Sequence, residues 1–161
     1  MKIREMNKED REKLKEILFK TENFSTEEKE VGLELIDIAI NNPDQKDYYF
    51  KVAEENGKVL GYYCIGHRAL TDGVYDLYWI VVDPEIRGSG IGTKLIKDAE
   101  EYVLSKKGRL ILAETSSRDD YQSTRSFYKK NNYNELAIIK DFYKKGDSLI
   151  IFGKYLQNQG E

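Results

Sequence analysis

The chain has 161 residues and a formal net charge of −3, from 26 lysines and arginines against 29 aspartates and glutamates. This length suits one domain with a core of its own, and the mild acidity argues against a partner bound through nucleic-acid phosphates. A hydrophobic fraction of 40% and an aromatic fraction of 12% exclude a disordered chain.

Nothing in the sequence predicts export or membrane insertion. Residues 1–13 are charged throughout and contain no apolar stretch of signal-peptide length. The longest apolar run, residues 77–82, is far too short to cross a bilayer. Cys64 is the single cysteine, so no internal disulfide can form, which indicates a reducing compartment. We therefore expect a cytoplasmic protein with no membrane contact.

Hydrophobic periodicity and turn residues divide the chain into short helices and strands, with no repeat and no linker. The elements predicted in chain order are a strand over residues 2–7, helices over 8–20 and 26–41, a hairpin over 47–66, a strand over 74–82, a helix from 91 to about 107, a strand over 109–117, a helix over 122–131, and strands over 133–143 and 147–155. This order predicts an α+β fold with a mixed, mostly antiparallel seven-stranded sheet, about four helices and a central βαβ unit. One domain over residues 1–161 is expected.

Capping and turn residues set several of these boundaries. Ser25 and Glu28 form a capping box, which predicts the start of the second helix. Asn56-Gly57 is a dipeptide preferred in type I′ hairpin turns. Gly108 is predicted to be the C′ residue of the third helix, and Asn132 to take a left-handed conformation after the fourth. The strand before the third helix is apolar at every position of its C-terminal half, as expected of a strand buried on both faces.

The stretch VVDPEIRGSGIGTKL, residues 81–95, joins that strand to the next helix through three glycines at alternate positions. Strand, glycine-rich turn and helix N-terminus form a phosphate cradle, because backbone N–H groups and the helix dipole both favour an anion. The spacing does not fit a P-loop, which requires glycine where Thr93 stands. It does not fit the dinucleotide fingerprint either, because the third glycine comes one residue early and the unit lies mid-chain. An adenine-nucleotide site stays open only as a near match to the P-loop.

Two segments resemble the GNAT N-acetyltransferase superfamily. Arg87, Gly90 and Gly92 match its acyl-CoA-binding motif, Q/R-x-x-G-x-G/A after the fourth strand. The segment YQSTRSFYKKNNY, residues 121–133, is similar to the family's N-x-x-A-x-x-F-Y-x-x-x-G-F. Its residues that match are Phe127, Tyr128 and the final aromatic, Tyr133, whereas Tyr121, Thr124 and Asn132 depart from the motif. Ser123 or Arg125 can replace the contact that the family's asparagine makes with the cofactor.

The resemblance implies an enzyme that transfers an acetyl group from acetyl-CoA to a primary amine by direct attack in a ternary complex, without a metal. It implies a backbone N–H of Val81 or Val82 as the donor to the developing oxyanion, and Tyr128 as the general acid beside the sulfur. The cofactor-binding residues that it implies are Val81, Val82, Arg87, Gly88, Ser89, Gly90, Ile91, Gly92, Thr93 and Ser123.

The general base stays open between two carboxylates and water. Glu114 lies near the C-terminal end of a predicted parallel strand, where such sheets present their sites, and Asp76 opens the strand before it. Tyr143, in the last predicted hairpin, resembles an acceptor-side residue of family members that acetylate peptide N-termini. His67 is interpreted as a structural or surface residue and Cys64 as a core residue.

The acceptor is therefore expected to be a small molecule or peptide that carries an amine, and exposed sheet edges are compatible with a homodimer. A different interpretation is an acyl-CoA-binding sensor or subunit without catalysis, which the departures at Tyr121 and Thr124 favour.

Overall fold

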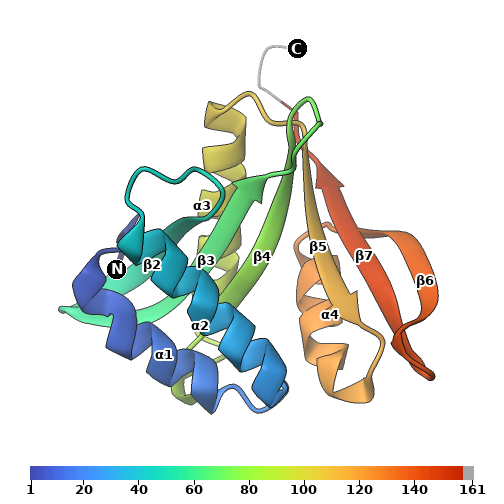
Figure 1. Cartoon of the computed structure of the whole chain (residues 1–161), viewed down its shortest axis with the longest axis horizontal. Coiled ribbons are helices and arrows are strands. Elements are labelled where there is room, and N and C mark those ends of the chain that lie inside the picture. Colours follow the sequence, from blue (N-terminus) through green and yellow to red (C-terminus); the bar gives the residue numbers. More distant parts are fainter. Residues whose placement is uncertain (158–161) are drawn as a thin grey trace. The chain divides into compact units, whose positions relative to one another are not determined.

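The structure is a computed structural model, and it describes residues 1–157 (Figure 1). The described residues form seven strands and four α-helices. In chain order these are β1 (Lys2–Glu5), α1 (Arg11–Lys20), α2 (Thr26–Asn41), β2 (Tyr49–Glu55), β3 (Lys58–His67), β4 (Val74–Val82), α3 (Ile91–Ser105), β5 (Leu110–Ser116), α4 (Gln122–Lys130), β6 (Asn134–Lys144) and β7 (Asp147–Tyr155). Single 3₁₀ turns precede α1, α3 and α4, at Lys8–Asp10, Pro84–Ile86 and Asp119–Tyr121.

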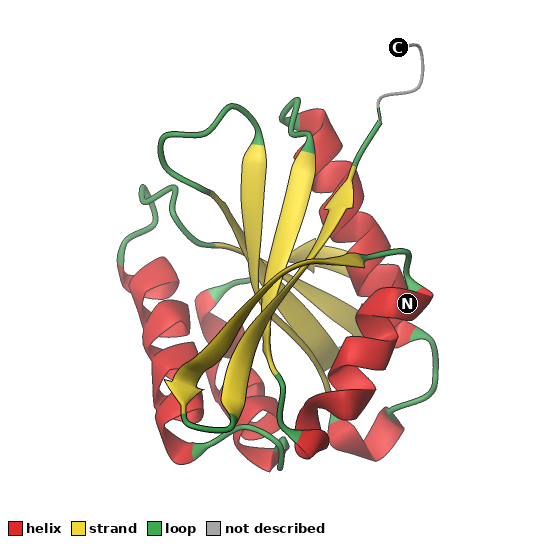
Figure 2. Ribbon diagram, turned by 90° about the vertical axis from the view of Figure 1, so that its right-hand side faces the viewer, coloured by secondary structure: helices red, strands yellow, loops and turns green. Residues whose placement is uncertain are grey.

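The strands follow the order β1-β2-β3-β4-β5-β7-β6 in a seven-stranded sheet, drawn in yellow in Figure 2. Strands β4 and β5 are parallel, as a crossover through α3 requires, and pair from Val74–Leu110 to Asp76–Leu112. The pairs β1–β2, β2–β3, β5–β7 and β6–β7 are antiparallel. The predicted α+β fold, with a mixed and mostly antiparallel sheet, is confirmed.

The chain divides into two compact units. One contains residues 1–66 and 78–101, and the other contains residues 67–77 and the chain from residue 102 onward. Both β4 and α3 contribute residues to each unit, and the expectation of a single domain over residues 1–161 stays a prediction.

In the first unit, α1 and α2 lie side by side in front of β2 and β3 (Figure 1). Their apolar faces meet the strands in a buried cluster that contains Leu14, Ile17, Ile36, Phe50, Val52, Val59, Tyr62, Cys64 and Val81. Each such side chain contributes about 1.5–3 kcal/mol when it leaves water. The two helices are also joined by Arg11, whose guanidinium donates to both carboxylate oxygens of Asp37, at 2.6 and 3.0 Å.

In the second unit, α4 packs on β7 through aromatic rings. The ring of Tyr128 stacks on Phe152 with centroids 5.7 Å apart, and it lies 5.6 Å from the ring of Tyr133. Strand β6, at the edge of the sheet, is exposed along its whole length. Helix α4 therefore depends on a small set of aromatic contacts with β7 and with the turn that follows it.

Both helices that precede β5 and β6 end in a Schellman motif. After α4, Asn132 has φ 69° and the amide of Tyr133 donates to the Tyr128 carbonyl at 2.9 Å, which confirms the prediction for Asn132. After α3, the left-handed residue is Lys107, with φ 61°, so the prediction that Gly108 is the C′ residue is wrong. Gly108 is the next residue, and its amide donates to the Val103 carbonyl at 2.8 Å. Glycine is needed there for space, because a Cβ would lie 2.3 Å from a Val103 methyl group.

Of three further local predictions, two are supported by the structure and one is not. Asn56 and Gly57 both have positive φ, 51° and 77°, which confirms the hairpin turn, and the Ser25 hydroxyl accepts from the Glu28 amide at 3.1 Å. The prediction that the end of β4 is buried on both faces is wrong, because Tyr78 is 40% exposed and Val82 is half-buried. An apolar run shows that a strand can be covered on both faces, whereas the neighbouring elements decide whether it is.

The adjacent tyrosines of β3 give a test of buried hydroxyl groups. Tyr62 and Tyr63 are both fully buried. The Tyr63 hydroxyl donates to Asp98 at 2.6 Å, but no group among residues 1–157 hydrogen-bonds to the Tyr62 hydroxyl. We expect Tyr62→Phe to raise the free energy of unfolding by about 1 kcal/mol, and Tyr63→Phe to lower it by a similar amount. Urea denaturation measures the free energy of unfolding of both variants. A lower value in both would contradict the view that the Tyr62 hydroxyl is buried without a hydrogen bond.

Asp10, just before α1, is a nearly buried carboxylate with 6% exposure. Arg4 donates to its two oxygens at 2.8 and 2.9 Å, and the Asn7 amide donates at 2.8 Å. Burial raises the pKa of Asp10, but Arg4 and the Asn7 amide outweigh it, so the pKa lies below its ordinary value. A carboxylate of this kind stabilises the fold above the unfolded-chain pKa of about 3.9, and the contribution is lost as the pH falls through the folded-state pKa.

We expect Asp10→Asn to lower the free energy of unfolding by about 2 kcal/mol near neutral pH, because Arg4 loses one of its two carboxylate partners, the other being Glu54. Urea denaturation of both proteins at about pH 7 and about pH 3 measures the effect, and the difference should shrink at the lower pH. A difference that does not change with pH would contradict the ion pair as its cause.

Candidate functional site

The glycine loop between β4 and α3, in the first unit, has a left-handed backbone at two positions. Gly88 has φ 83° and Gly90 has φ 84°. No atom lies within 4 Å of a Cβ built at either glycine, so these positions require glycine for backbone conformation and not for space. The loop leads directly into the 15-residue helix α3, whose N-terminus favours an anion. The open space at both glycines fits the pyrophosphate of a CoA ester.

Asp83 anchors the start of this loop. Its side chain is 6% exposed and accepts from the Glu85 amide at 3.1 Å, while its own amide donates to the Leu60 carbonyl at 2.9 Å. The ammonium group of Lys13, on α1, lies 3.5 Å from the Asp83 carboxylate. Further along, the Ser89 hydroxyl donates to the Ile86 carbonyl at 2.7 Å, so this hydroxyl shapes the turn and only the Ser89 backbone is left for a ligand.

The first turn of α3 is set by one buried and two half-buried residues. Ile91 is 7% exposed and packs inward, which fixes where the helix begins. The Lys94 amide donates to the Gly90 carbonyl at 3.2 Å and closes the first turn. Gly92 and Thr93 lie half-buried in that turn, and Arg87 and Ser89 are exposed beside it. The predicted cofactor residues from Arg87 to Thr93 therefore lie together in one loop and helix start.

The end of β4 is held close to β3. Val81 has 3% exposure and belongs to the core cluster, whereas Val82 is half-buried. A Cβ at Gly61 of β3 would lie 2.7 Å from the Val81 carbonyl and 3.2 Å from the Val82 Cα. Glycine at position 61 thus permits the close approach that places the backbone of the predicted oxyanion donors.

In the second unit, Arg68 links both predicted bases. Its Nε and Nη2 donate to the same oxygen of Asp76, at 3.1 and 2.8 Å. Its Nη2 lies 3.9 Å from Glu114 Oε1. The Asp76 side chain is 13% exposed and that of Glu114 is 49% exposed. Asp76 is therefore held in an ion pair, and Glu114 remains accessible to solvent.

The predicted acid lies on α4 within the aromatic cluster. Tyr128 is 5% exposed, and burial raises the pKa of its hydroxyl well above the ordinary value. Ser123 is exposed in the first turn of the same helix. Arg125 instead points back along the chain and donates to the carbonyls of Ser116 and Arg118, at 2.7 and 2.8 Å. Of the two replacements expected for the family's asparagine, Arg125 is thus engaged with protein carbonyls and Ser123 stays exposed.

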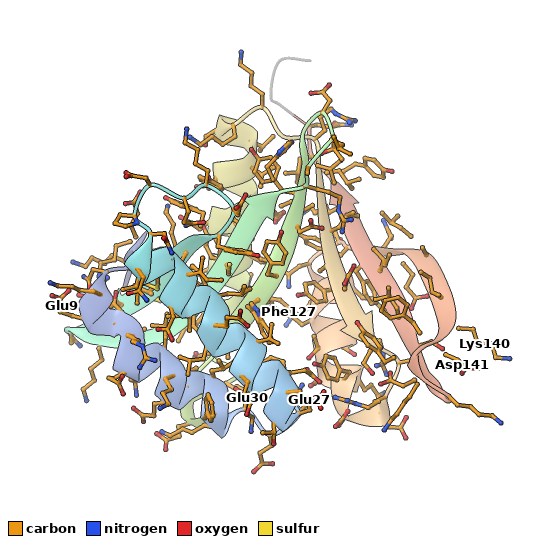
Figure 3. All side chains as sticks on the ribbon, viewed as in Figure 1. Glu9, Glu27, Glu30, Phe127, Lys140 and Asp141 are labelled. Carbon is orange, nitrogen blue, oxygen red and sulfur yellow. The ribbon has the colours of Figure 1, made fainter. Side chains whose placement is uncertain are left out.

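Tyr143 lies near the end of β6 and is 48% exposed. Its ring makes an edge-to-face contact with Phe142 at 5.0 Å. Nearby, Lys140 and Asp141 carry exposed side chains on the same strand (Figure 3). The hairpin thus presents an aromatic hydroxyl and charged groups to solvent.

The remaining sequence candidates have structural roles. Cys64 is fully buried, and burial raises the pKa of its thiol. His67 is exposed, and its Nε2 lies 2.9 Å from the Thr71 carbonyl. Within residues 1–157, no group of three or more His, Cys, Asp or Glu could hold a metal ion. None of the helices in this range is long and apolar enough to span a membrane.

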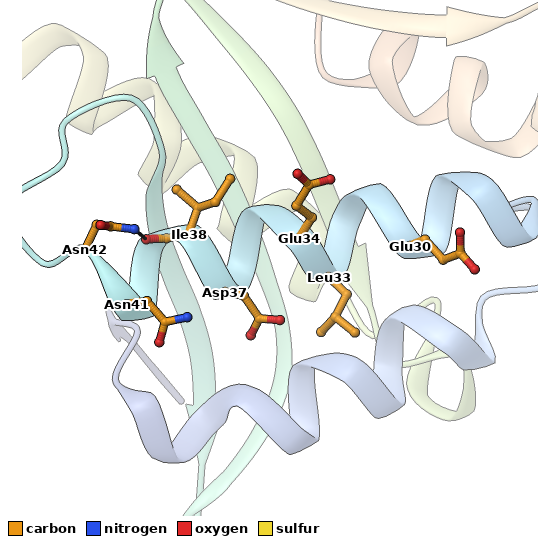
Figure 4. A pocket seen from close by; sticks show the side chains of 7 residues that line it. All are labelled: Glu30, Leu33, Glu34, Asp37, Ile38, Asn41 and Asn42. Carbon is orange, nitrogen blue, oxygen red and sulfur yellow. Dashed lines mark hydrogen bonds between the residues drawn. The ribbon is translucent and has the colours of Figure 1, made fainter.

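A shallow groove of about 390 Å³ runs along one side of α2 (Figure 4). It is lined by Glu30, Leu33, Glu34, Asp37, Ile38, Asn41 and Asn42. Glu27 and Glu30 lie in the N-terminal half of the same helix (Figure 3). Of the groove's carboxylates, Asp37 is already paired with Arg11.

The sequence interpretation missed three residues that shape these sites, namely Arg68, Asp83 and Ser116. The Asp83-Pro84 dipeptide is a turn signal that could have revealed the role of Asp83, because an aspartate before such a turn accepts hydrogen bonds from the amides of the turn. No comparable local pattern marks Arg68 or Ser116, whose partners lie on other strands.

Three comparisons with known proteins bear on the family and the fold of this chain. The family model described as an acetyltransferase (GNAT) domain matches residues 46–135, which is more than half of the chain. The chain belongs to the GNAT family of acetyltransferases. A crystal structure assigned to this family, from Desulfovibrio desulfuricans, superposes with a TM-score of 0.91 at 34% identity, over 96% of this chain and 98% of that one.

Two further relatives bear on the family and the fold. An uncharacterized N-acetyltransferase of Methanocaldococcus jannaschii is 33% identical over 99 residues, which is 59% of this chain. The chain spans 43% of the length of that relative. An aminoglycoside 6′-N-acetyltransferase in complex with coenzyme A has a TM-score of 0.76 at 19% identity, with full coverage of both chains. At that identity the likeness concerns the fold.

We expect Gly90→Ala to weaken acetyl-CoA binding about tenfold or more, because a left-handed φ costs alanine about 1–2 kcal/mol and the loop must change to relieve it. Isothermal titration calorimetry with acetyl-CoA measures the dissociation constant. Gly57→Ala is the matched control, since Gly57 has a similar φ, 77°, in the β2–β3 turn. The control should lose thermal stability and keep its affinity. Equal affinities for Gly90→Ala and wild type would contradict the assignment of the loop.

Proposed function

We propose that the protein is an acetyl-CoA-dependent N-acetyltransferase that acetylates a primary amine. The observation that carries this proposal is the open, left-handed loop at Gly88 and Gly90, directly before α3. Membership of the GNAT family and the likeness to a fold crystallised with coenzyme A support it. A cytoplasmic location is part of the proposal, in keeping with the single buried cysteine.

Acetyl-CoA supplies the acetyl group as a thioester. The backbone amides from Arg87 to Thr93 bind its pyrophosphate, with the positive end of the α3 dipole behind them. Ser123 contributes a hydroxyl at the start of α4. The backbone N–H of Val81 or Val82 stabilises the negative charge that develops on the carbonyl oxygen.

Glu114 is the favoured general base. An amine is a nucleophile only after it loses a proton, and Glu114 carries an accessible carboxylate whose Oε1 lies 3.9 Å from Arg68 Nη2. Asp76 is less suited, because one of its oxygens already accepts two hydrogen bonds from Arg68. In this assignment Arg68 holds Asp76 in place, and Glu114 takes the proton directly or through water.

Tyr128 is the proposed general acid, which protonates the departing sulfur. Burial raises the pKa of its hydroxyl, so the group stays protonated through neutral and moderately alkaline pH. A raised pKa suits a general acid, because the acid must stay protonated until it transfers the proton to the leaving group. The rate should therefore show no decline from this group below about pH 10.

The acceptor is proposed to be a small molecule or peptide with a primary amine, and Tyr143 is proposed to contact it. The exposed position of Tyr143 on the last hairpin supports this assignment. A homodimer is compatible with the exposed edge strand β6.

The test is amine-dependent release of free CoA thiol from acetyl-CoA. The panel contains peptides with free N-termini, lysine peptides, amino acids, polyamines and aminoglycosides. Because Cys64 is fully buried, the folded protein should add no thiol signal of its own. Turnover with one class names the acceptor. Acetyl-CoA binding without turnover would favour the non-catalytic sensor, and absence of binding would overturn the proposal.

Three single variants separate the acid from the two possible bases. Tyr128→Phe should lower kcat about 100-fold and leave acetyl-CoA affinity within about threefold. Glu114→Gln should lower the rate most at low pH, and its deficit should shrink as the pH approaches the amine pKa, about 8–10, where the amine is already neutral. Asp76→Asn is the control. The same pH pattern in Asp76→Asn but not in Glu114→Gln would reassign the base.

A further inference from the structure

Asp147, the first residue of β7, is a buried carboxylate that the proposed chemistry does not use. It is 3% exposed. The Ser116 hydroxyl donates to its Oδ1, and Arg118 Nη1 lies 4.0 Å from its Oδ2. Ser116 itself is 6% exposed. A buried carboxylate is costly unless it is hydrogen-bonded or paired, so these two contacts define the orientation of Asp147.

The same contacts hold the turn between β5 and α4. The Arg118 amide donates to the Ser116 hydroxyl at 3.0 Å, so this hydroxyl connects the turn to Asp147. From the other side, Arg125 of α4 donates to the Ser116 and Arg118 carbonyls. Tyr121, at the N-cap position of α4, makes no side-chain capping hydrogen bond. The start of α4 is therefore positioned by the contacts of Ser116 and Arg125 and not by a capping side chain.

The turn is also hydrogen-bonded to the hairpin between β6 and β7. The Ser117 amide donates to the Ser148 carbonyl at 2.9 Å, and the Ser148 amide donates to the Ser117 hydroxyl at 2.8 Å. Asp147 pairs with Lys144 in the β6–β7 ladder. The residue before Lys144 is Tyr143. One turn thus contacts both the helix that carries Ser123 and Tyr128 and the hairpin that carries Tyr143.

We propose that Asp147 is a positioning residue for acetyl transfer. Through Ser116 and Arg118 it orients the start of α4, and through the hairpin it orients the segment next to Tyr143. Without the carboxylate, the Ser116 hydroxyl loses the acceptor at Oδ1 and the Arg118 guanidinium loses one of its two nearby carboxylates, so the turn can adopt other conformations. This inference rests on the proposed function, because it assigns the positioned groups to cofactor and acceptor.

The experiment compares Asp147→Ala, Asp147→Asn, Ser116→Ala and the double alanine variant with wild type, using the acceptor found in the thiol-release assay. Asp147→Ala should lower kcat and raise the acceptor KM, so that kcat/KM falls about tenfold or more. Asp147→Asn keeps an oxygen for Ser116 and should recover part of this loss. Because Ser116 and Asp147 act through each other, the double variant should be no worse than Asp147→Ala.

The matched control is Asp120→Asn. Asp120 accepts from Arg118 Nε at 3.1 Å, so this variant also removes a carboxylate from Arg118 but leaves the contact with β7. Its kcat/KM should stay within about twofold of wild type. Hydrogen exchange at the Arg118 and Ser148 amides should quicken in Ser116→Ala and Asp147→Ala and not in the control.

A different result is expected if Asp147 only stabilises the fold. A merely structural Asp147 would lower the melting temperature and the active fraction, with unchanged KM for the folded molecules. That outcome, or additive losses in the double variant, would overturn the inference. If Asp147→Ala does not fold, Ser116→Ala carries the same comparison. Absence of acetyl-CoA binding by the wild-type protein would instead mark failure of the proposed function, and the inference would fail with it.

Discussion

The left-handed backbone at Gly88 and Gly90 is the constraint on which the candidate cofactor site depends. Positive φ at alternate positions turns successive amides toward one side, and a residue with a Cβ would resist it. The loop can hold this shape because both of its ends are fixed. Asp83 holds the first end through hydrogen bonds and Lys13, and Ile91 packs the second end into the core. A flexible glycine turn is thereby made into an organised candidate anion site at the start of α3.

Three nearly buried carboxylates are stabilised in the same way. Asp10, Asp83 and Asp147 are nearly buried, and each is hydrogen-bonded by a backbone amide or a side chain close to it. Each of these carboxylates also fixes a turn that leads into a helix. The Tyr62 hydroxyl differs from them, because it has no hydrogen-bond partner among residues 1–157. Burial thus allows the three carboxylates to fix the turns beside them, because a buried carboxylate is stable only in orientations that keep its hydrogen bonds.

Local chemistry explains why much of the fold could be predicted. The capping serine at Ser25, the Asn56-Gly57 turn and Asn132 after α4 are short-range signals whose physics involves only neighbouring residues. The two wrong predictions depend on packing. At the end of α3, Lys107 takes the left-handed position and Gly108 packs closely against Val103, and the half-open face of β4 depends on what lies beside the strand. The glycine loop was predictable because its function resides in the backbone.

The sequence by itself determined the order of helices and strands, the glycine loop before the third helix and the resemblance to the GNAT family. These properties depend on residue types at fixed spacing along the chain. Only the tertiary structure decided that Arg68 occupies Asp76 and leaves Glu114 accessible, that Arg125 binds carbonyls of the preceding turn, and that Ser116 and Asp147 are partners. Each of these contacts is made between residues of different elements. Strand pairing and helix packing bring such residues within hydrogen-bonding distance, whereas local spacing along the chain does not.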